Sequence, residues 1–328
     1  LSSPGPDWER VREKHPDVKC IEVPMERHIS LVRDFKALVA LWRVFRMEKP
    51  MMVHSMTPKA GMLCMVASWM ALVPVRVHTF TGLVFPTSVG LKRKILMATD
   101  WLTCACATHI IPEGQGVLDD LTNHKICRKA MQVLGYGNVM GVDMERFSSV
   151  RFKGIVKNKD EFRFVFVGRV VGDKGVNELV EAFVRLNKEI PNTRLAIVGG
   201  YETHLDPLNP ETQNMIDNNK NIDTLGTVYG DALLEEYLKS DCFVMPSYRE
   251  GFPNAVLEAG ALGLPSIVTD INGSREIIIN GKNGLIVPSK NADALYHAMK
   301  VMVEDESARK SMAANSRSLI NSRFEKSF

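Results

Sequence analysis

Two apolar segments separated by one loop and one helix constrain the fold of this chain more than any other feature. Cys242 to Pro246 forms the first segment, and Pro265 to Thr269 forms the second. Both are short, uncharged and mostly apolar, which is typical of strands that are buried on both faces of a sheet. The residues from Asn254 to Leu262 read as a helix, and Pro253 stands where a helix favours its first residue. A strand, a helix and a strand in this order predict a parallel β-α-β crossover.

The loop of this crossover carries one carboxylate, and the helix carries a second. Glu250 lies in the loop, and Glu258 lies about one and a half turns into the helix. The loop leads to a helix N-terminus beside the carboxyl ends of parallel strands, where free backbone N–H groups and the helix dipole attract an anion. Carboxylates next to an anion site suit hydroxyl groups, which a sugar or a ribose supplies. An ordinary crossover with two surface glutamates is the structural alternative.

Strand-like and helix-like segments alternate along the rest of the chain, which favours parallel, helix-flanked sheets. The predicted strands are Val18–Val23, Met51–His54, Val75–Phe80, Ala105–Ile111, Met131–Leu134, Phe162–Val167, Arg194–Val198 and Thr224–Val228. The predicted helices span residues 30–47, 62–73, 92–102, 117–130, 176–186, 231–239, 273–280 and 291–304, with a short one within 201–221. With 328 residues the chain is long enough for two domains. We place their boundary in the polar stretch 135–160, which gives domains at 1–150 and 151–328.

The charge and the cysteines limit the class of protein. Residues 1–150 hold 19 Lys and Arg against 14 Asp and Glu, which suits an anionic partner or a membrane surface. This charge is weak and is not interleaved with aromatic residues, so we expect no nucleic-acid partner. The six cysteines form no Cys-x-x-Cys pair and read as buried thiols of a reducing compartment. The longest apolar run, Ala60 to Val75, is shorter than the roughly 20 residues that span a bilayer, so we expect a cytoplasmic protein.

The crossover block resembles the signature of the retaining glycosyltransferases of family 4. Seven residues separate Glu250 from Glu258, and Glu250 stands within Ser-x-x-Glu-Gly-Phe-Pro-Asn. Further landmarks of that family are Val167-Gly-Arg-x-x-x-x-Lys-Gly175, Val198-Gly-Gly, Leu225-Gly-x-Val228 and Asn272-Gly-Ser-Arg-Glu276. The resemblance implies the α/β GT-B fold, in which two Rossmann-like domains face each other across a cleft.

The first half resembles one branch of this family, which extends polyprenyl-diphosphate-linked saccharides in capsular polysaccharide or glycan biosynthesis. The segments that carry this resemblance are His54 to Gly61, Val77 to Gly82 and Gly137 to Asp143. The family's first domain opens with a strand and a glycine-rich turn, and its last helix crosses back to that domain. By this comparison the chain starts beyond the first feature and stops near the start of the second, so we expect the first domain to be truncated at its N-terminus.

The resemblance makes residues 151–328 the domain that binds the nucleotide-sugar donor. Arg169 and Lys174 would clamp the donor diphosphate, because fixed cations stabilise the charge that the departing nucleoside diphosphate gains. Glu258 would accept hydrogen bonds from the ribose, and Glu250 would lie nearer the transferred sugar, at the reacting centre. The other predicted donor-binding residues are Gly251, Phe252, Asn254, Ala255 and, beside the base, Val228. Solvated loop charges are the alternative for the two cations, and packing beneath the loop is the alternative for Phe252.

Residues 1–150 would bind the acceptor. His54 and His78 each stand at the end of a predicted strand, where ligands of parallel sheets bind. The family commonly has a histidine at the position of Thr81, so we assign neither His54 nor His78 as a catalytic base, and ordinary packing is the alternative for both. Lys59 lies in a turn from which it could meet the diphosphate of the acceptor.

A basic triplet in the first half suggests a membrane surface. Lys92, Arg93 and Lys94 directly precede the apolar Ile95-Leu96-Met97. This combination could dock an anionic membrane surface, which fits the branch resemblance. A solvated helix face explains the triplet as well.

The predicted function is a retaining hexosyl- or N-acetylhexosaminyltransferase of bacterial surface polysaccharide or glycan assembly. It would use a nucleotide-sugar, most simply a UDP-sugar, and a lipid-diphosphate-linked saccharide, at the inner face of the plasma membrane as a peripheral protein. We expect no cofactor and no metal, since the cationic clamp makes a divalent ion unnecessary. A GT-B nucleotide-sugar epimerase and a non-catalytic sugar-nucleotide-binding subunit are the alternative functions.

Overall fold

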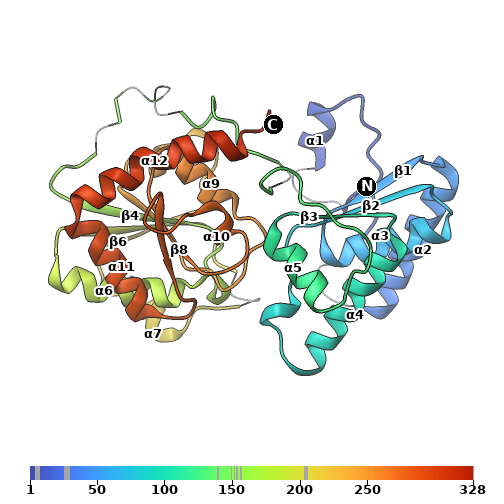
Figure 1. The fold of residues 1–328 in the computed structure, drawn as a ribbon, viewed down its shortest axis with the longest axis horizontal. Coiled ribbons are helices and arrows are strands. Elements are labelled where there is room, and N and C mark those ends of the chain that lie inside the picture. The colour runs from blue at the N-terminus through green and yellow to red at the C-terminus, as the bar shows by residue number, and fades with distance from the viewer. Residues whose placement is uncertain are drawn as a thin grey trace. The chain divides into compact units, whose positions relative to one another are not determined.

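The chain folds into two compact units. The computed structural model describes residues 1–3, 8–25, 30–138, 140–148, 150, 152, 154–155, 157–202 and 206–327. Unit 1 comprises Leu1–Glu113 and Val117–Val133, and unit 2 comprises Gly114–Gly116 and Leu134–Phe328 (Figure 1). Residues 134–150, which we predicted as the end of the first domain, therefore group with unit 2.

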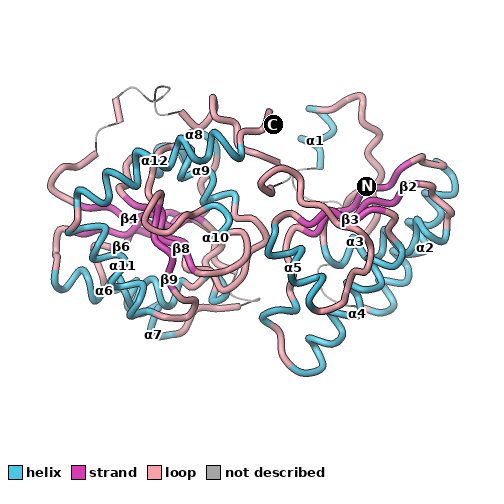
Figure 2. The backbone as a smooth tube through the Cα atoms, in the orientation of Figure 1, coloured by secondary structure: helices cyan, strands magenta, loops and turns pink. Residues whose placement is uncertain are grey.

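Unit 1 is built on a parallel sheet of three strands within the described residues, in the order β1-β2-β3. Its elements are α1 (Trp8–Lys14), α2 (Leu31–Glu48), β1 (Met52–Ser55), α3 (Pro58–Met70), β2 (Val75–Phe80), η1 (Phe85–Thr87), α4 (Gly90–Cys106), β3 (His109–Pro112) and α5 (Gln115–Asn123). The strands are flanked by helices, as Figure 2 shows. The core includes Leu41, Phe45, Met65, Phe85 and Leu121. All four tryptophans of the chain lie in this unit, at positions 8, 42, 69 and 101.

Some bounds in unit 1 differ from the prediction for local reasons. Helix α3 begins at Pro58 because Thr57 caps it in an extended conformation and a proline suits the first helical position. Helix α4 runs on to Cys106, so the predicted strand Ala105–Ile111 starts only at His109. The predicted strands Val18–Val23 and Met131–Leu134 are reduced to isolated bridges between Ser2 and Glu22 and between Ile110 and Met131.

Unit 2 contains a sheet of six parallel strands in its described part, in the order β6-β5-β4-β7-β8-β9. Its elements are β4 (Phe162–Val167), η3 (Gly172–Lys174), α6 (Val176–Glu189), β5 (Thr193–Val198), α7 (Pro210–Asn218), β6 (Ile222–Gly226), α8 (Gly230–Leu238), β7 (Cys242–Met245), α9 (Asn254–Ala261), β8 (Ser266–Thr269), α10 (Ser274–Ile277), β9 (Gly284–Val287), α11 (Ala292–Glu304) and α12 (Glu306–Phe324). This strand order is that of a doubly wound α/β fold.

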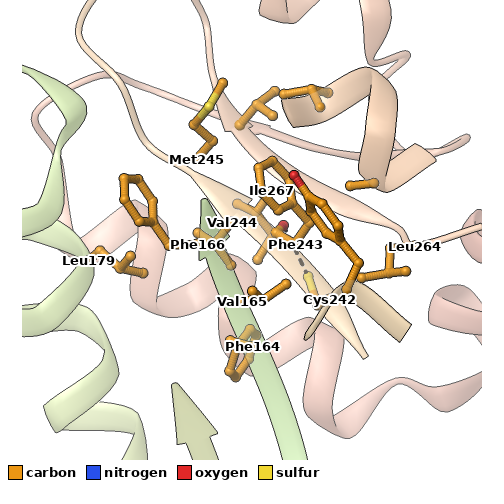
Figure 3. Close-up of a cluster of buried hydrophobic side chains, with 14 of the residues drawn as sticks. Phe164, Val165, Phe166, Leu179, Cys242, Phe243, Val244, Met245, Leu264 and Ile267 are labelled. Carbon is orange, nitrogen blue, oxygen red and sulfur yellow. Dashed lines mark hydrogen bonds between the residues drawn. The ribbon is translucent and has the colours of Figure 1, made fainter. Parts of the chain in front are cut away.

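The centre of unit 2 is an apolar core between the sheet and its helices. Figure 3 shows apolar side chains from the two central strands, among them Phe164 and Phe166 of β4 and Phe243 of β7. Strand β7 is buried along its whole length, as the uncharged sequence predicts. Helix α6 buries Leu179, Phe183 and their neighbours along one face. Each fully buried side chain of this size stabilises the fold by about 1.5–3 kcal/mol, which holds β4 and β7 in place.

Two elements of unit 2 were missed in the sequence. Strand β9 spans four residues, and helix α12 has a polar sequence with only a sparse apolar stripe. Helix α12 nevertheless packs against α9, because Gly260 leaves room for Ile320: a Cβ on Gly260 would lie 2.7 Å from Ile320 Cγ1. A few apolar side chains are therefore enough to pack α12 against α9, because the surface of α9 has a groove at Gly260.

The first prediction concerns Gly175, which ends η3 with a φ of 71° and lies against Pro246. A Cβ there would stand 2.0 Å from the Pro246 carbonyl oxygen. Gly175→Ala should lower the free energy of unfolding by about 3 kcal/mol or more, because left-handed strain adds to a forced separation of two loops. Scanning calorimetry measures this change.

Gly281→Ala is the matched control. Gly281 has a φ of 74°, but a Cβ there would meet nothing within 4 Å. Its substitution should cost only the left-handed strain, about 1–2 kcal/mol. Equal costs at the two positions would show that the contact between the loops adds no stability.

Candidate active site

The predicted donor residues gather at one point of the sheet in unit 2. Strands β4 and β7 are neighbours, with β5 and β6 on the far side of β4 and β8 and β9 on the far side of β7. In a doubly wound sheet this is the topological switch point, and ligands bind outside the carboxyl ends of the strands there. The loops that follow these two strands span residues 168–175 and 246–253. They carry Arg169, Lys174 and Glu250.

Backbone and side-chain contacts join these two loops. The Tyr248 backbone N–H donates to the Asp173 carbonyl at 2.9 Å, and Arg249 Nη2 donates to Asp173 Oδ2 at 2.8 Å. The Tyr248 hydroxyl donates to Glu178 Oε1 of α6 at 2.6 Å. Sequence reasoning missed these residues, although Tyr248 and Arg249 directly precede Glu250. Their contacts hold the two loops in one arrangement.

A short, partly buried ion pair at the site joins two predicted catalytic residues. Lys174 Nζ lies 2.5 Å from Glu250 Oε1, and the two side chains are only 17% and 15% exposed. Partial burial strengthens the attraction, because water screens the pair less than it would a surface pair. The fold thus brings together residues that stand 76 positions apart in the sequence. Lys174 is therefore not a solvated loop charge, whereas Arg169, the other cation of the predicted clamp, is 43% exposed.

Arg169 has a different partner. Its Nη1 donates to Glu202 Oε2 at 2.8 Å, and Glu202 follows the end of β5, the strand next to β4. The hydrogen bond and charge of Glu202 raise the pKa of Arg169 above its ordinary value, and Asp173 and Glu250 add to this effect. Sequence reasoning missed Glu202, but the adjacency of the two strand ends could have indicated it.

Glu258 is a half-buried carboxylate on α9. The hydroxyl of the buried Tyr237, on α8, donates to Glu258 Oε2 at 3.2 Å. Burial raises the pKa of Glu258 above its ordinary value, whereas the Tyr237 hydrogen bond and the charge of Arg146 act in the opposite direction. The ionised carboxylate is therefore held at a cost, and hydroxyl donors from a ligand would reduce that cost.

The N-terminus of α9 presents backbone groups at the same place. Pro253 is the N-cap, in an extended conformation, and Asn254 is the first helical residue, as the predicted range Asn254–Leu262 has it. Asn254 is exposed and Ala255 is half-buried, whereas the ring of Phe252 is 6% exposed and packs against Phe324 at 5.4 Å between centroids. The packing alternative thus describes the Phe252 ring, and only the backbone of Phe252 is left for a ligand.

Two further loops complete the carboxyl edge of this sheet. Gly251 lies against Gly273, where a Cβ would stand 2.1 Å from the Gly251 carbonyl oxygen. Val228 lies half-buried between β6 and α8, and its neighbour Thr227 approaches Gly200 of the loop after β5. Apart from Glu258, which lies in the middle of α9, the predicted donor residues therefore lie on loops or helix starts that follow strands of one sheet.

The predicted acceptor residues lie in unit 1. His54 Nε2 and Thr79 Oγ1 share a hydrogen bond of 2.8 Å, and so do His78 Nδ1 and Ser55 Oγ. His78 is 1% exposed, and burial, followed by the charge of His54, lowers its pKa to about 4. His78 is therefore a neutral, buried side chain at neutral pH. Lys59 Nζ lies 2.5 Å from Asp34 Oδ1 of α2.

A cavity of about 1190 Å³ opens beside β1 in unit 1, and His54 and Lys59 line it, whereas His78 does not. Among the residues that the structure describes, no three or more His, Cys, Asp or Glu side chains gather as a metal site would require. In that same part of the chain, each helix is too short or too polar to cross a bilayer.

Comparison with known proteins extends this picture. The family model "Glycosyl transferases group 1" matches residues 149–319, and the model "Glycosyl transferase 4-like domain" matches residues 1–137. The chain is similar to the capsular polysaccharide biosynthesis glycosyltransferase CapM of Staphylococcus aureus, with 30% identity over 92% of this chain and 80% of that protein. It is also similar to the Escherichia coli UDP-Gal:alpha-D-GlcNAc-diphosphoundecaprenol alpha-1,3-galactosyltransferase, with 32% identity over 90% of this chain and 76% of that protein.

A solved structure supports the fold. The Anabaena protein HepE in complex with UDP and glucose resembles this chain with a TM-score of 0.77 and 16% identity, over 97% of this chain and 85% of that one. This similarity, together with the two parallel-sheet units, confirms the predicted GT-B fold.

The second prediction concerns the pH dependence of stability. Because the pKa of Glu258 is raised in the folded state, its contribution to stability is present at low pH and is lost as the pH rises through the raised pKa. Glu258→Gln removes this ionisation while it keeps an acceptor for Tyr237. Its melting temperature, relative to the wild type, should therefore increase between pH 4 and pH 8, as calorimetry can measure.

Glu211→Gln is the control, since Glu211 is an exposed carboxylate at the start of α7. It removes the same charge from the same unit without a change in burial. A pH-independent effect of Glu258→Gln, equal to that of the control, would contradict the prediction.

Proposed function

This chain belongs to the group 1 glycosyltransferase family, and we propose that it is a retaining enzyme that moves one sugar from a UDP-sugar to a lipid-diphosphate-linked saccharide. The names of its relatives support this choice of substrates. The E. coli relative is named for UDP-Gal and a diphosphoundecaprenol acceptor, and CapM for capsular polysaccharide biosynthesis. The solved HepE structure holds UDP and glucose. The product would be a longer lipid-linked saccharide for bacterial surface polysaccharide or glycan assembly.

The observation that carries the proposal is the contact of Lys174 with Glu250 at the switch point. Without a donor, the two residues neutralise each other at 2.5 Å. A donor diphosphate beside the N-terminus of α9 offers Lys174 a second anionic partner, and it frees Glu250 to face the transferred sugar. Because Glu250 already fixes the Lys174 side chain, Lys174 needs little rearrangement when the diphosphate binds.

The proposed reaction needs no side chain as a general base. In the proposed step the bond between the anomeric carbon and the diphosphate oxygen breaks, and the acceptor oxygen bonds to the same face of the sugar. The acceptor proton passes to the departing diphosphate oxygen, so charge and protons balance. Arg169 and Lys174 stabilise the leaving group, because its negative charge grows as the bond breaks.

Glu258 fits the ribose of the donor. The Tyr237 hydroxyl donates to Oε2 of the Glu258 carboxylate. The two ribose hydroxyls would donate to this carboxylate and stabilise its ionised form, which burial disfavours. Binding of the nucleotide would thus offset a cost that the unoccupied protein carries.

The acceptor would bind to unit 1. Lys59 lines the same cavity as His54. His78, neutral and buried, would hold Ser55 in place and would not act as a base. A lipid-linked acceptor requires work at a membrane surface, which we propose to be the cytoplasmic face, where nucleotide-sugars are made.

The third prediction tests the clamp. Lys174→Met should reduce transfer of labelled sugar from UDP-sugars to undecaprenyl-diphosphate-GlcNAc by about 100- to 1000-fold, because a charge that stabilises the leaving group is lost. Arg185→Met is the matched control, since Arg185 forms an exposed ion pair with Asp293 in the same unit. It should leave the rate unchanged.

A second variant separates catalysis from folding. Lys174→Met leaves Glu250 unpaired and half-buried, which destabilises the fold. The double variant Lys174→Met/Glu250→Gln removes that unpaired charge, so it should recover the melting temperature but not the rate. Full transfer by either variant would overturn the assignment. A product that forms from the donor without acceptor would indicate the epimerase, and nucleotide binding without any product would indicate the non-catalytic subunit.

A further inference from the structure

Helix α4 exposes a stripe of apolar side chains on its outward side. At 100° per residue, Leu91, Ile95, Ala98 and Leu102 fall on one side of the helix. All four are exposed, Leu91 by 74%. The opposite face packs against the unit and carries Leu96, Met97 and Cys104 together with the polar Asp100 and Thr103. A surface helix ordinarily turns polar side chains to water, so the exposed apolar stripe favours a partner from outside the unit.

The residues beside this stripe suit one kind of partner. Lys92 and Lys94 lie exposed on its two flanks, and Trp101 is 55% exposed beside its far end. Asp100 is the acidic residue of α4, and it lies on the buried face. An apolar stripe flanked by lysines and a tryptophan matches the interface of an anionic bilayer, where acyl chains meet phosphates.

The first turn of α2 carries a similar patch. Leu31, Val32 and Phe35 are exposed, and Lys36 lies exposed beside them. Helices α3 and α4 follow strands β1 and β2 and so begin at the carboxyl edge of the sheet, while α2 leads into β1 and so also begins there. Helix α3 contacts both α2 and α4 (Figure 1). The two apolar helix starts therefore lie at the sheet edge that carries His54 and Lys59.

We propose that the outward face of α4, with the first turn of α2, docks unit 1 onto an anionic lipid surface. The proposal rests on the proposed function in one respect, namely that a lipid-linked acceptor has to be reached at a membrane. It corrects the surface predicted from the basic triplet. Arg93 turns inward, where its Nη2 contacts His124 Nε2 at 3.0 Å, and Leu96 and Met97 pack against the core.

In this arrangement α4 lies in the plane of the interface. The stripe enters the boundary of the acyl chains, while Lys92 and Lys94 contact lipid phosphates on either side. The carboxyl edge of the sheet in unit 1, where α4 begins, then lies along the lipid surface, and an acceptor diphosphate at the surface comes within reach of Lys59. The docking face thus presents the acceptor side of the enzyme to its substrate.

The test is flotation of the purified chain with lipid vesicles. Vesicles of phosphatidylglycerol and phosphatidylethanolamine should carry the wild type, whereas vesicles of phosphatidylcholine should carry much less. Ile95→Glu should weaken binding about tenfold or more, because it places a carboxylate in the stripe. Lys92→Gln/Lys94→Gln should weaken it about fivefold for each lysine. Val301→Glu is the matched control, since Val301 is 42% exposed on α11 of unit 2 and Ile95 is 46% exposed.

The outcomes separate the possible occupants of the stripe. Equal flotation of the wild type and Ile95→Glu would overturn the proposal. A wild-type dimer in sedimentation that Ile95→Glu makes monomeric, with no vesicle binding by either, would show that a second copy covers the stripe. Transfer to a detergent-solubilised acceptor tests the proposed function separately. Vesicle binding without sugar transfer would support the docking surface and refute the proposed function. Sugar transfer without vesicle binding would support the proposed function and refute the docking surface.

Discussion

The candidate site depends on close approaches of backbone to backbone that only glycine allows. Gly175 lies on the Pro246 carbonyl and Gly273 on the Gly251 carbonyl, each with too little space for a methyl group. The loops that carry Lys174 and Glu250 are therefore positioned by the main chain in addition to the side-chain contacts of Tyr248 and Arg249. This frees charged residues at the strand ends to face a ligand. Catalytic groups on a rigid frame lose little entropy when substrate binds.

The same site removes charged side chains from water, which opposes folding. Lys174 and Glu250 are largely removed from water, and Glu258 ionises against its burial. A buried ion pair rarely stabilises more than an apolar pair of the same size would. The large apolar core beneath, with Phe164 and Phe243 at its centre, supplies the stability that these groups do not. In unit 2, stability thus comes from the apolar core, whereas the predicted catalytic groups lie at the strand ends.

The sequence predicted the α/β class, the family and most strands, because buried parallel strands and their turn residues are local signals. It did not predict the partner of Arg169 or the burial of the Phe252 ring, because both depend on segments distant in sequence, Glu202 and Phe324. The apolar run Ile95-Leu96-Met97 was taken as one block, whereas the helix turns Ile95 outward and its two neighbours inward. Helix α12 was missed because its apolar residues are too sparse to form a pattern without the groove at Gly260. Which residues of the candidate site contact substrate stays a prediction.

The placement of the tryptophans has a practical consequence. All four lie in unit 1, while the predicted donor residues all lie in unit 2. Intrinsic emission therefore comes from one unit, while nucleotide would bind to loops of the other. A spectral change upon addition of nucleotide would show that binding to unit 2 alters the surroundings of an indole of unit 1. The chain carries its own optical reporter of communication between the two halves, and it needs no attached dye.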